Sequence, residues 1–216
     1  MEVAYEMFDV SQFHGDFCCN GKSPMPSPGL NIDGFGPVSL PINAATNQEI
    51  TQLGIQSRND PNATPASNFV EFDPSIISIT NPMWTSALEV VIHSVAERLG
   101  LETTDFECRL TKVVLENEGV PFDRNRFLTA IPNSFGSIEI QFPSAFRNGA
   151  HLIRHQGLAR TFSVGADDSS NIYETFFVSR FFDCAHEVEQ ISQGSRSTSR
   201  FPPHANSGRG GVVRFC

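Results

Sequence analysis

The sequence lacks several features that would place it in a large class of proteins. It has no apolar run near the ~18 residues of a membrane span, and no basic-then-apolar signal pattern at its N-terminus. No run of lysine and arginine offsets the net charge of −9, which argues against a nucleic-acid surface. We therefore expect an intracellular, cytoplasmic chain that binds neither membrane nor nucleic acid. The sequence does not indicate any other partner.

Cysteine is scarce, and its spacing suits neither a disulfide framework nor a zinc finger. The five cysteines are an odd number, and no two of them have the CxxC spacing. We expect ordinary reduced thiols. Motifs for a phosphate-binding loop or for Ser-His-Asp hydrolysis are also missing. Gly208-x-Gly210-Gly211 has neither the preceding strand nor the following helix that a nucleotide-binding loop requires.

The chain does contain enough apolar residues for one globular domain. Of its 216 residues 39% are hydrophobic and 18% are charged. We expect an irregular lead-in over residues 1–37, a single domain over 38–196 and an atypical, disorder-prone tail over 197–216. Because Pro202 and Pro203 are unsuited to a central strand, we also expect the final strand of the domain to be incomplete.

The clearest local pattern predicts a helix over residues 82–99. Asn81 is a good N-cap and Pro82 suits the first helical position. Gly100 can end the helix in a left-handed conformation. One face of the helix is apolar and is expected to be core, with Trp84, Leu88, Val91, Ile92, Val95 and Leu99 at helical spacing.

Short β segments separated by turn residues dominate the rest of the chain. A first short strand is expected over 38–42, and six more follow residue 106, at 108–115, 137–142, 151–155, 161–164, 173–182 and 186–191. One helix and this many short strands predict a mostly-β fold. We expect a double-stranded β-helix (jelly roll) supported by the helix on one side.

The most informative segment is residues 182–188, FDCAHEV, which Arg196 follows ten positions after His186. It resembles the distal half of the active site of the Fe(II)/2-oxoglutarate dioxygenases of the prolyl-4-hydroxylase-like group. The resemblance implies that His186 binds iron and that Arg196 holds the far carboxylate of 2-oxoglutarate. Further matches to the family occur in the expected order, namely GFGP at 34–37, NPxW at 81–84, LExEG at 115–119, FPS at 142–144 and IRHxG at 153–157.

The same resemblance places two residues that cannot serve as iron ligands where the family has His-x-Asp. The register from Gly119 to Gly136 is ungapped, and it puts Asn125 and Phe127 at the two ligand positions. An amide is a poor substitute for imidazole, and a phenyl ring cannot bind a metal. The resemblance thus implies descent from an oxidoreductase that used Fe(II) and 2-oxoglutarate, with catalysis lost. We expect Asn125, Phe127 and His186 to converge inside the sandwich.

Two alternatives stay open at this stage. The chain could be a working hydroxylase with a rebuilt metal site, for which Asp123, His151 and His155 are the replacement ligands. His155, however, also matches a family residue outside the iron triad. The chain could instead be a non-enzymatic β-sandwich binding module, in which case the ordered matches to the family are accidental.

Overall fold

The computed structural model describes residues 15–57, 69–102, 106–120, 134–163 and 172–205. Its helices are α1 (Ala44–Ser57), a 3₁₀ turn (Pro74–Ile76) and α2 (Met83–Leu99). The strands are β1 (Cys18–Ser23), β2 (Leu30–Ile32), β3 (Gly36–Pro37), β4 (Phe69–Phe72), β5 (Ile77–Ile79), β6 (Phe106–Cys108), β7 (Lys112–Asn117), β8 (Gly136–Gln141), β9 (Phe146–Asn148), β10 (His151–His155), β11 (Leu158–Phe162), β12 (Thr175–Phe181), β13 (Ala185–Val188), β14 (Ile191–Phe201) and β15 (Pro203–Ala205).

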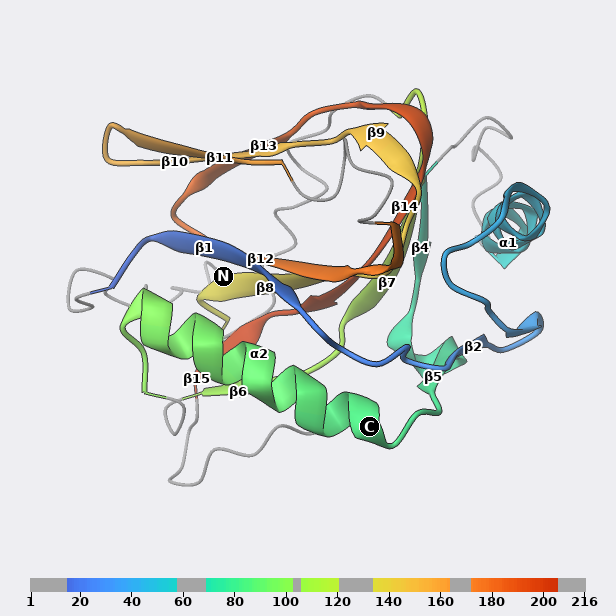
Figure 1. Cartoon of the computed structure of the whole chain (residues 1–216), viewed down its shortest axis with the longest axis horizontal. Helices are drawn as coiled ribbons and strands as arrows, with labels where there is room; N and C mark the ends of the chain where they lie inside the picture. Colours follow the sequence, from blue (N-terminus) through green and yellow to red (C-terminus); the bar gives the residue numbers. More distant parts are fainter. Residues whose placement is uncertain (1–14, 58–68, 103–105, 121–133, 164–171, 206–216) are drawn as a thin grey trace, which may run out of the picture.

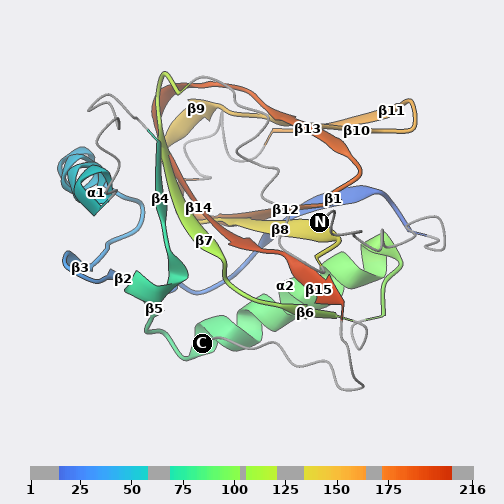
Figure 2. The same ribbon diagram turned by 180° about the vertical axis from the view of Figure 1, so that it is seen from behind.

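Two antiparallel sheets form the body of the protein. The larger has the strand order β1-β12-β8-β14-β7-β4, with β9 paired to the start of β14, and the smaller has the order β11-β10-β13. Figure 1 shows the smaller sheet as a layer opposite β12 and β8, and the view from behind in Figure 2 shows the same separation. The predicted mostly-β fold with antiparallel sheets, arranged as a jelly-roll-like sandwich, is confirmed.

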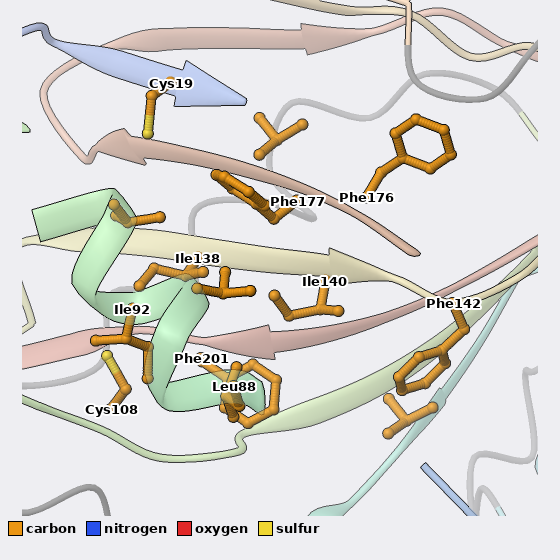
Figure 3. Close-up of a cluster of buried hydrophobic side chains, with 14 of the residues drawn as sticks. Cys19, Leu88, Ile92, Cys108, Ile138, Ile140, Phe142, Phe176, Phe177 and Phe201 are labelled. Atoms are coloured by element: carbon orange, nitrogen blue, oxygen red, sulfur yellow. The ribbon is translucent and has the colours of Figure 1, made fainter. Parts of the chain in front are cut away.

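Helix α2 covers one face of the larger sheet. Trp84 and Leu88 of this helix are fully buried, and the Trp84 ring meets Phe142 edge-on with centroids 5.6 Å apart. In Figure 3, Leu88 lies among the same buried side chains as Ile138 and Ile140 of β8. Each such side chain contributes about 1.5–3 kcal/mol by leaving water. The supporting helix predicted over 82–99 is confirmed.

The opposite face of the larger sheet is polar. Side chains alternate along a strand, so Ser137, Glu139 and Gln141 of β8 point away from Ile138 and Ile140. All five are buried. The polar three therefore lie on the side of the sheet that faces the smaller sheet, and this interior layer holds the residues described below.

Gly100 ends α2 as the sequence predicts. Its φ of 71° is left-handed, and its N–H lies within hydrogen-bonding range of the carbonyl groups of Ala96 and Glu97. Gly100→Ala should therefore lower the free energy of unfolding by about 1–2 kcal/mol, measured by urea denaturation. Gly100→Asn should lose less, because asparagine tolerates this conformation better. Equal losses in the two variants would show that the left-handed cap is not the cause.

The N-terminal region is more ordered than the sequence suggests. Residues 1–37 were expected to be an irregular lead-in, yet β1, β2 and β3 lie within residues 18–37. β1 pairs along its whole length with β12 and forms the edge of the larger sheet. The strand expected over 38–42 is absent, since Pro37 already ends β3, and α1 was not predicted. Gly54 of α1 lies close against Val70 of β4, which explains how this weakly apolar helix packs.

The expectation of an incomplete final strand is wrong. β14 runs to Phe201 between β8 and β7, so residues 197–201 belong to the centre of the sheet and not to a tail. Small hydroxyl residues fill this part of the strand because they make internal hydrogen bonds, as Ser197 does with Ser144. Pro202 and Pro203 come after the central ladder has ended, and Pro203 opens the short strand β15 opposite Cys108. Residues 206–216 lie outside the described residues.

The remaining predicted strands are found with shifted ends. The segment expected over 108–115 is two strands, β6 and β7, and the one expected over 161–164 is β11. β8, β10, β12 and β13 match their predictions within a few residues. In the part of the chain that the structure describes, no helix has the length and apolar character that crossing a membrane requires.

Candidate functional site

Two histidines meet on the inner side of the smaller sheet. His151 begins β10 and His186 lies on the neighbouring strand β13, where it pairs with Ile153. The two rings are stacked with centroids 5.2 Å apart, and His151 Nδ1 lies 3.0 Å from His186 Nε2. Both side chains are buried.

Arg196 of β14 links this histidine pair to a glutamate of the larger sheet. Its Nη2 contacts the carboxylate of Glu116 on β7 at 2.5 Å. Its Nη1 donates to the carbonyl of Gly149 at 2.9 Å and lies 3.2 Å from Nε2 of His151. The Arg196 side chain is only 2% exposed. The four side chains Glu116, Arg196, His151 and His186 thus form one continuous chain of polar contacts, called the buried network below.

The direction of each hydrogen bond in the buried network follows from the donors available. A guanidinium can only donate, so Nε2 of His151 must accept from Arg196. A neutral His151 then carries its proton on Nδ1 and donates it to Nε2 of His186. The lone pair of His186 Nε2 is therefore already engaged within the protein.

Both histidines are held in the neutral form. Burial lowers the pKa of His151 well below its ordinary value, and the charge of Arg196 lowers it further. Burial likewise lowers the pKa of His186, with added repulsion from Arg180, Arg200 and Arg196. Neutral rings agree with the donor pattern, since a protonated His151 could not accept from Arg196.

A second buried charge cluster lies beside the buried network on the larger sheet. Cross-strand pairing places Arg200 opposite Glu139 and puts Arg180 on the same face of the sheet. Burial alone would raise the pKa of Glu139, but the nearby positive charges, led by Arg200, hold it below its ordinary value. Oε1 of Gln141 is buried and has no hydrogen-bond partner among the described residues.

The structure brings together three of the residues singled out in the sequence. His186 and Arg196 belong to the same buried network, and His151, one of the candidate replacement ligands, joins them. Asn125, Phe127 and Asp123 fall within 121–133, outside the described residues, so their convergence with His186 stays a prediction. His155 does not join the other two histidines. Its Nδ1 instead lies 3.6 Å from a carboxylate oxygen of Asp183.

The sequence did not predict that Glu116 and Glu139 are buried carboxylates at the candidate site. Both are acidic residues next to aliphatic side chains in short strands, KVVLEN and GSIEIQ. A carboxylate in such a strand is a signal for a buried cation partner, because burying it unpaired is costly. The partners, Arg196 and Arg200, come from a strand that was expected to be malformed.

The described residues do not fit Fe(II) and 2-oxoglutarate. His186 is the sole described residue at a predicted ligand position, and its Nε2 already accepts a hydrogen bond. The Arg196 guanidinium already has the carboxylate of Glu116 as its partner. Within the described ranges, one group of three metal-ligating side chains has its ligand atoms close together. It consists of His155, Asp183 and Cys184, and does not include His186.

Comparison with known proteins finds likeness only among solved structures. No family model and no curated protein matches the chain. A 2OG-Fe(II) oxygenase-family oxidoreductase from Burkholderia pseudomallei matches with a TM-score of 0.39 and 14% identity, over 62% of each chain. A prolyl-4-hydroxylase from Pseudomonas putida matches with a TM-score of 0.43 and 14% identity, over 92% of this chain and 97% of the other. Likeness at this level does not assign a function.

Proposed function

We propose that the chain is a protein of the Fe(II)/2-oxoglutarate dioxygenase type, prolyl-4-hydroxylase-like, whose catalysis has been lost. The ordered sequence motifs around His186 and Arg196 support the descent. The observation that supports the loss is the buried network, in which these two residues bond to protein groups instead of facing a ligand site. Asn125 and Phe127 add chemical support, since they would leave His186 as a single iron ligand.

The contact between Arg196 and Glu116 gives a physical reason for the loss of catalysis. A 2-oxoglutarate carboxylate would have to displace Glu116, which reaches Nη2 at 2.5 Å and is itself mostly buried. Displacement would leave the Glu116 carboxylate without its cation in a low-dielectric interior, which is costly. The Glu116–Arg196 pair therefore takes the place of the co-substrate contact.

Purified protein supplied with Fe(II), ascorbate and 2-oxoglutarate should release no more succinate than a metal-free blank. The reason is that the metal must offer sites to both O₂ and the 2-oxoacid, and one histidine does not hold it. The double variant Asn125→His with Phe127→Asp should gain Fe(II) binding, measured by calorimetry. If the unmodified chain releases succinate in an Fe(II)-dependent manner, the loss of catalysis is refuted.

A second candidate is the hydroxylase with a rebuilt metal site, which one observation favours. Two nitrogen ligands at right angles about an ion, each ~2.1 Å away, lie ~3 Å apart. Nδ1 of His151 and Nε2 of His186 are 3.0 Å apart. Fe(II)-dependent succinate release that disappears in both His151→Gln and Asp123→Asn would establish this candidate. If neither the unmodified chain nor the double variant binds Fe(II) while folded, the non-enzymatic binding module is favoured.

A further inference from the structure

We propose that His155, Asp183 and Cys184 form a zinc site at the end of the smaller sheet. Nδ1 of His155 lies 3.6 Å from Oδ2 of Asp183, and Sγ of Cys184 lies 3.7 Å from Oδ1 of the same carboxylate. The three ligand atoms all fall within 4.8 Å of one another. The site is separate from the buried network, and the inference does not depend on the proposed function.

The sheet itself brings these ligands together. In the β10–β13 pairing, His151 lies opposite Val188 and Arg154 opposite Ala185. Continuing this register by one residue places His155 opposite Cys184, so their side chains leave the sheet on the same side. Asp183 precedes Cys184 in the turn that ends β12. The backbone N–H of Cys184 donates to the carbonyl of Phe181 and fixes that turn.

The distances are close to those of a tetrahedral zinc ion. With Zn–N and Zn–O bonds of ~2.1 Å and a Zn–S bond of ~2.3 Å, the ligand atoms of a tetrahedron lie ~3.4–3.6 Å apart. The 3.6 Å separation from His155 runs to Oδ2 of Asp183 and the 3.7 Å separation from Cys184 runs to Oδ1, so each agrees with one oxygen of the carboxylate. With one ligand atom per residue the three atoms lie within 4.8 Å of one another, so side-chain shifts of about 1 Å would bring them to tetrahedral separations. Imidazole, carboxylate and thiolate together are a ligand set that favours zinc over calcium or magnesium.

Exposure at the site suits an ion that enters from solvent. The side chain of Asp183 is 40% exposed and that of His155 is 20% exposed, whereas Cys184 is buried. Three protein ligands leave the fourth position to water, which is the arrangement found in catalytic zinc sites. Zinc binding would release the thiol proton of Cys184, because only the thiolate is a metal ligand.

Without a metal, the group is held by a His155–Asp183 contact and by hydrogen bonds of the Cys184 thiol. The thiol donates to Oδ1 of Asp183 and to the carbonyl of Phe17, so zinc would replace these two bonds as well as the 3.6 Å contact of His155. The sequence does not predict this site, because His155 and Asp183 come from segments far apart along the chain. For the same reason, a search for CxxC spacing finds no zinc motif.

Cobalt and zinc titrations of the reduced full-length protein test the site. Co²⁺ should bind with one equivalent and give the near-ultraviolet charge-transfer band of a cobalt–thiolate bond, and Zn²⁺ should displace it. Cys184→Ala should abolish the band. Asp183→Asn should weaken Zn²⁺ binding by at least about tenfold, measured by competition with a chelating dye, because it removes a ligand. This second variant changes an exposed side chain, so it tests the site even if Cys184→Ala fails to fold.

Matched controls separate this site from other thiols and histidines. Cys108→Ala removes another buried thiol, and His93→Gln removes an exposed histidine of α2. Both should keep the band and the zinc affinity. The proposal is overturned if the folded protein gives no charge-transfer band, or if the band survives Cys184→Ala. It is also overturned if Asp183→Asn binds zinc as tightly as the unmodified chain.

Discussion

Arg196→Met should destabilise the protein by about 3–5 kcal/mol, the largest effect we expect from a single substitution in the buried network. Methionine keeps much of the side-chain volume but leaves the carboxylate of Glu116 without its cation. It also removes the donor to His151 Nε2 and to the carbonyl of Gly149. The loss should be visible as a lower midpoint of urea unfolding with an unchanged slope.

Two comparisons show whether this cost comes from the unpaired charge. The double variant Glu116→Gln with Arg196→Met should recover part of the loss, because no buried charge is then left unpaired. Arg154→Met breaks the half-exposed pair between Arg154 and Glu187 on β10 and β13, and should cost no more than about 1 kcal/mol. A loss in Arg196→Met no larger than that in Arg154→Met would mean that the buried network does not stabilise the fold.

Local patterns in the sequence were enough to predict the parts of the fold that are stabilised locally. Helix α2 was predictable because Asn81, an apolar stripe and Gly100 act within one segment, and Met83 N–H does donate to Asn81 Oδ1. β8 was predictable because apolar and polar residues alternate along it. β1 and β14 were not, because their strand character depends on distant partners.

β14 illustrates the physical reason for the failure. Its segment 195–200, SRSTSR, has none of the apolar residues that normally mark a central strand. Residues 196–200 are nevertheless buried, because Ser197 bonds to Ser144 and because Arg196 and Arg200 face carboxylates on β7 and β8. Charge pairing between strands replaces hydrophobic burial here. Pairing of that kind cannot be read from one segment alone.

The candidate site was predictable only in part for the same reason. His186 and Arg196 stood out through a short motif, and the structure places them in one network. Glu116 and His151, which complete it, lie on other strands. Glu116 was noticed only as part of a family match and His151 only as a possible replacement ligand, because no local pattern shows a contact with Arg196. Asn125 and Phe127 lie outside the described residues, so the metal half of the site stays a prediction.

The buried network should make the protein sensitive to mild acid. Burial, followed by repulsion from nearby arginines, lowers the pKa of His151 and of His186 in the folded state. The unfolded chain, with histidine pKa values near about 6.5, then binds more protons than the folded chain at lower pH. Stability is therefore complete above that pH and falls as the pH drops below it. This dependence of stability on pH has the opposite sign to that caused by a histidine whose pKa is raised in the folded state by a carboxylate partner.

The expected loss is on the order of 1 kcal/mol per histidine for each pH unit below about 6.5, or about 2–3 kcal/mol for the pair on going from about pH 7.5 to about pH 5.5. At His151, Arg196 and Arg180 reinforce the effect and Glu139 opposes it. At His186, Arg180, Arg200 and Arg196 reinforce it.

Urea unfolding at a series of pH values measures this loss. His186→Gln removes one of the two titrating groups and should reduce the pH dependence by about half. His93→Gln, on the exposed side of α2, should leave it unchanged. If the two histidines were protonated in the folded protein, the free energy of unfolding would instead rise as the pH falls across this range. That result would also contradict the donor pattern, because a protonated His151 could not accept the hydrogen bond from Arg196.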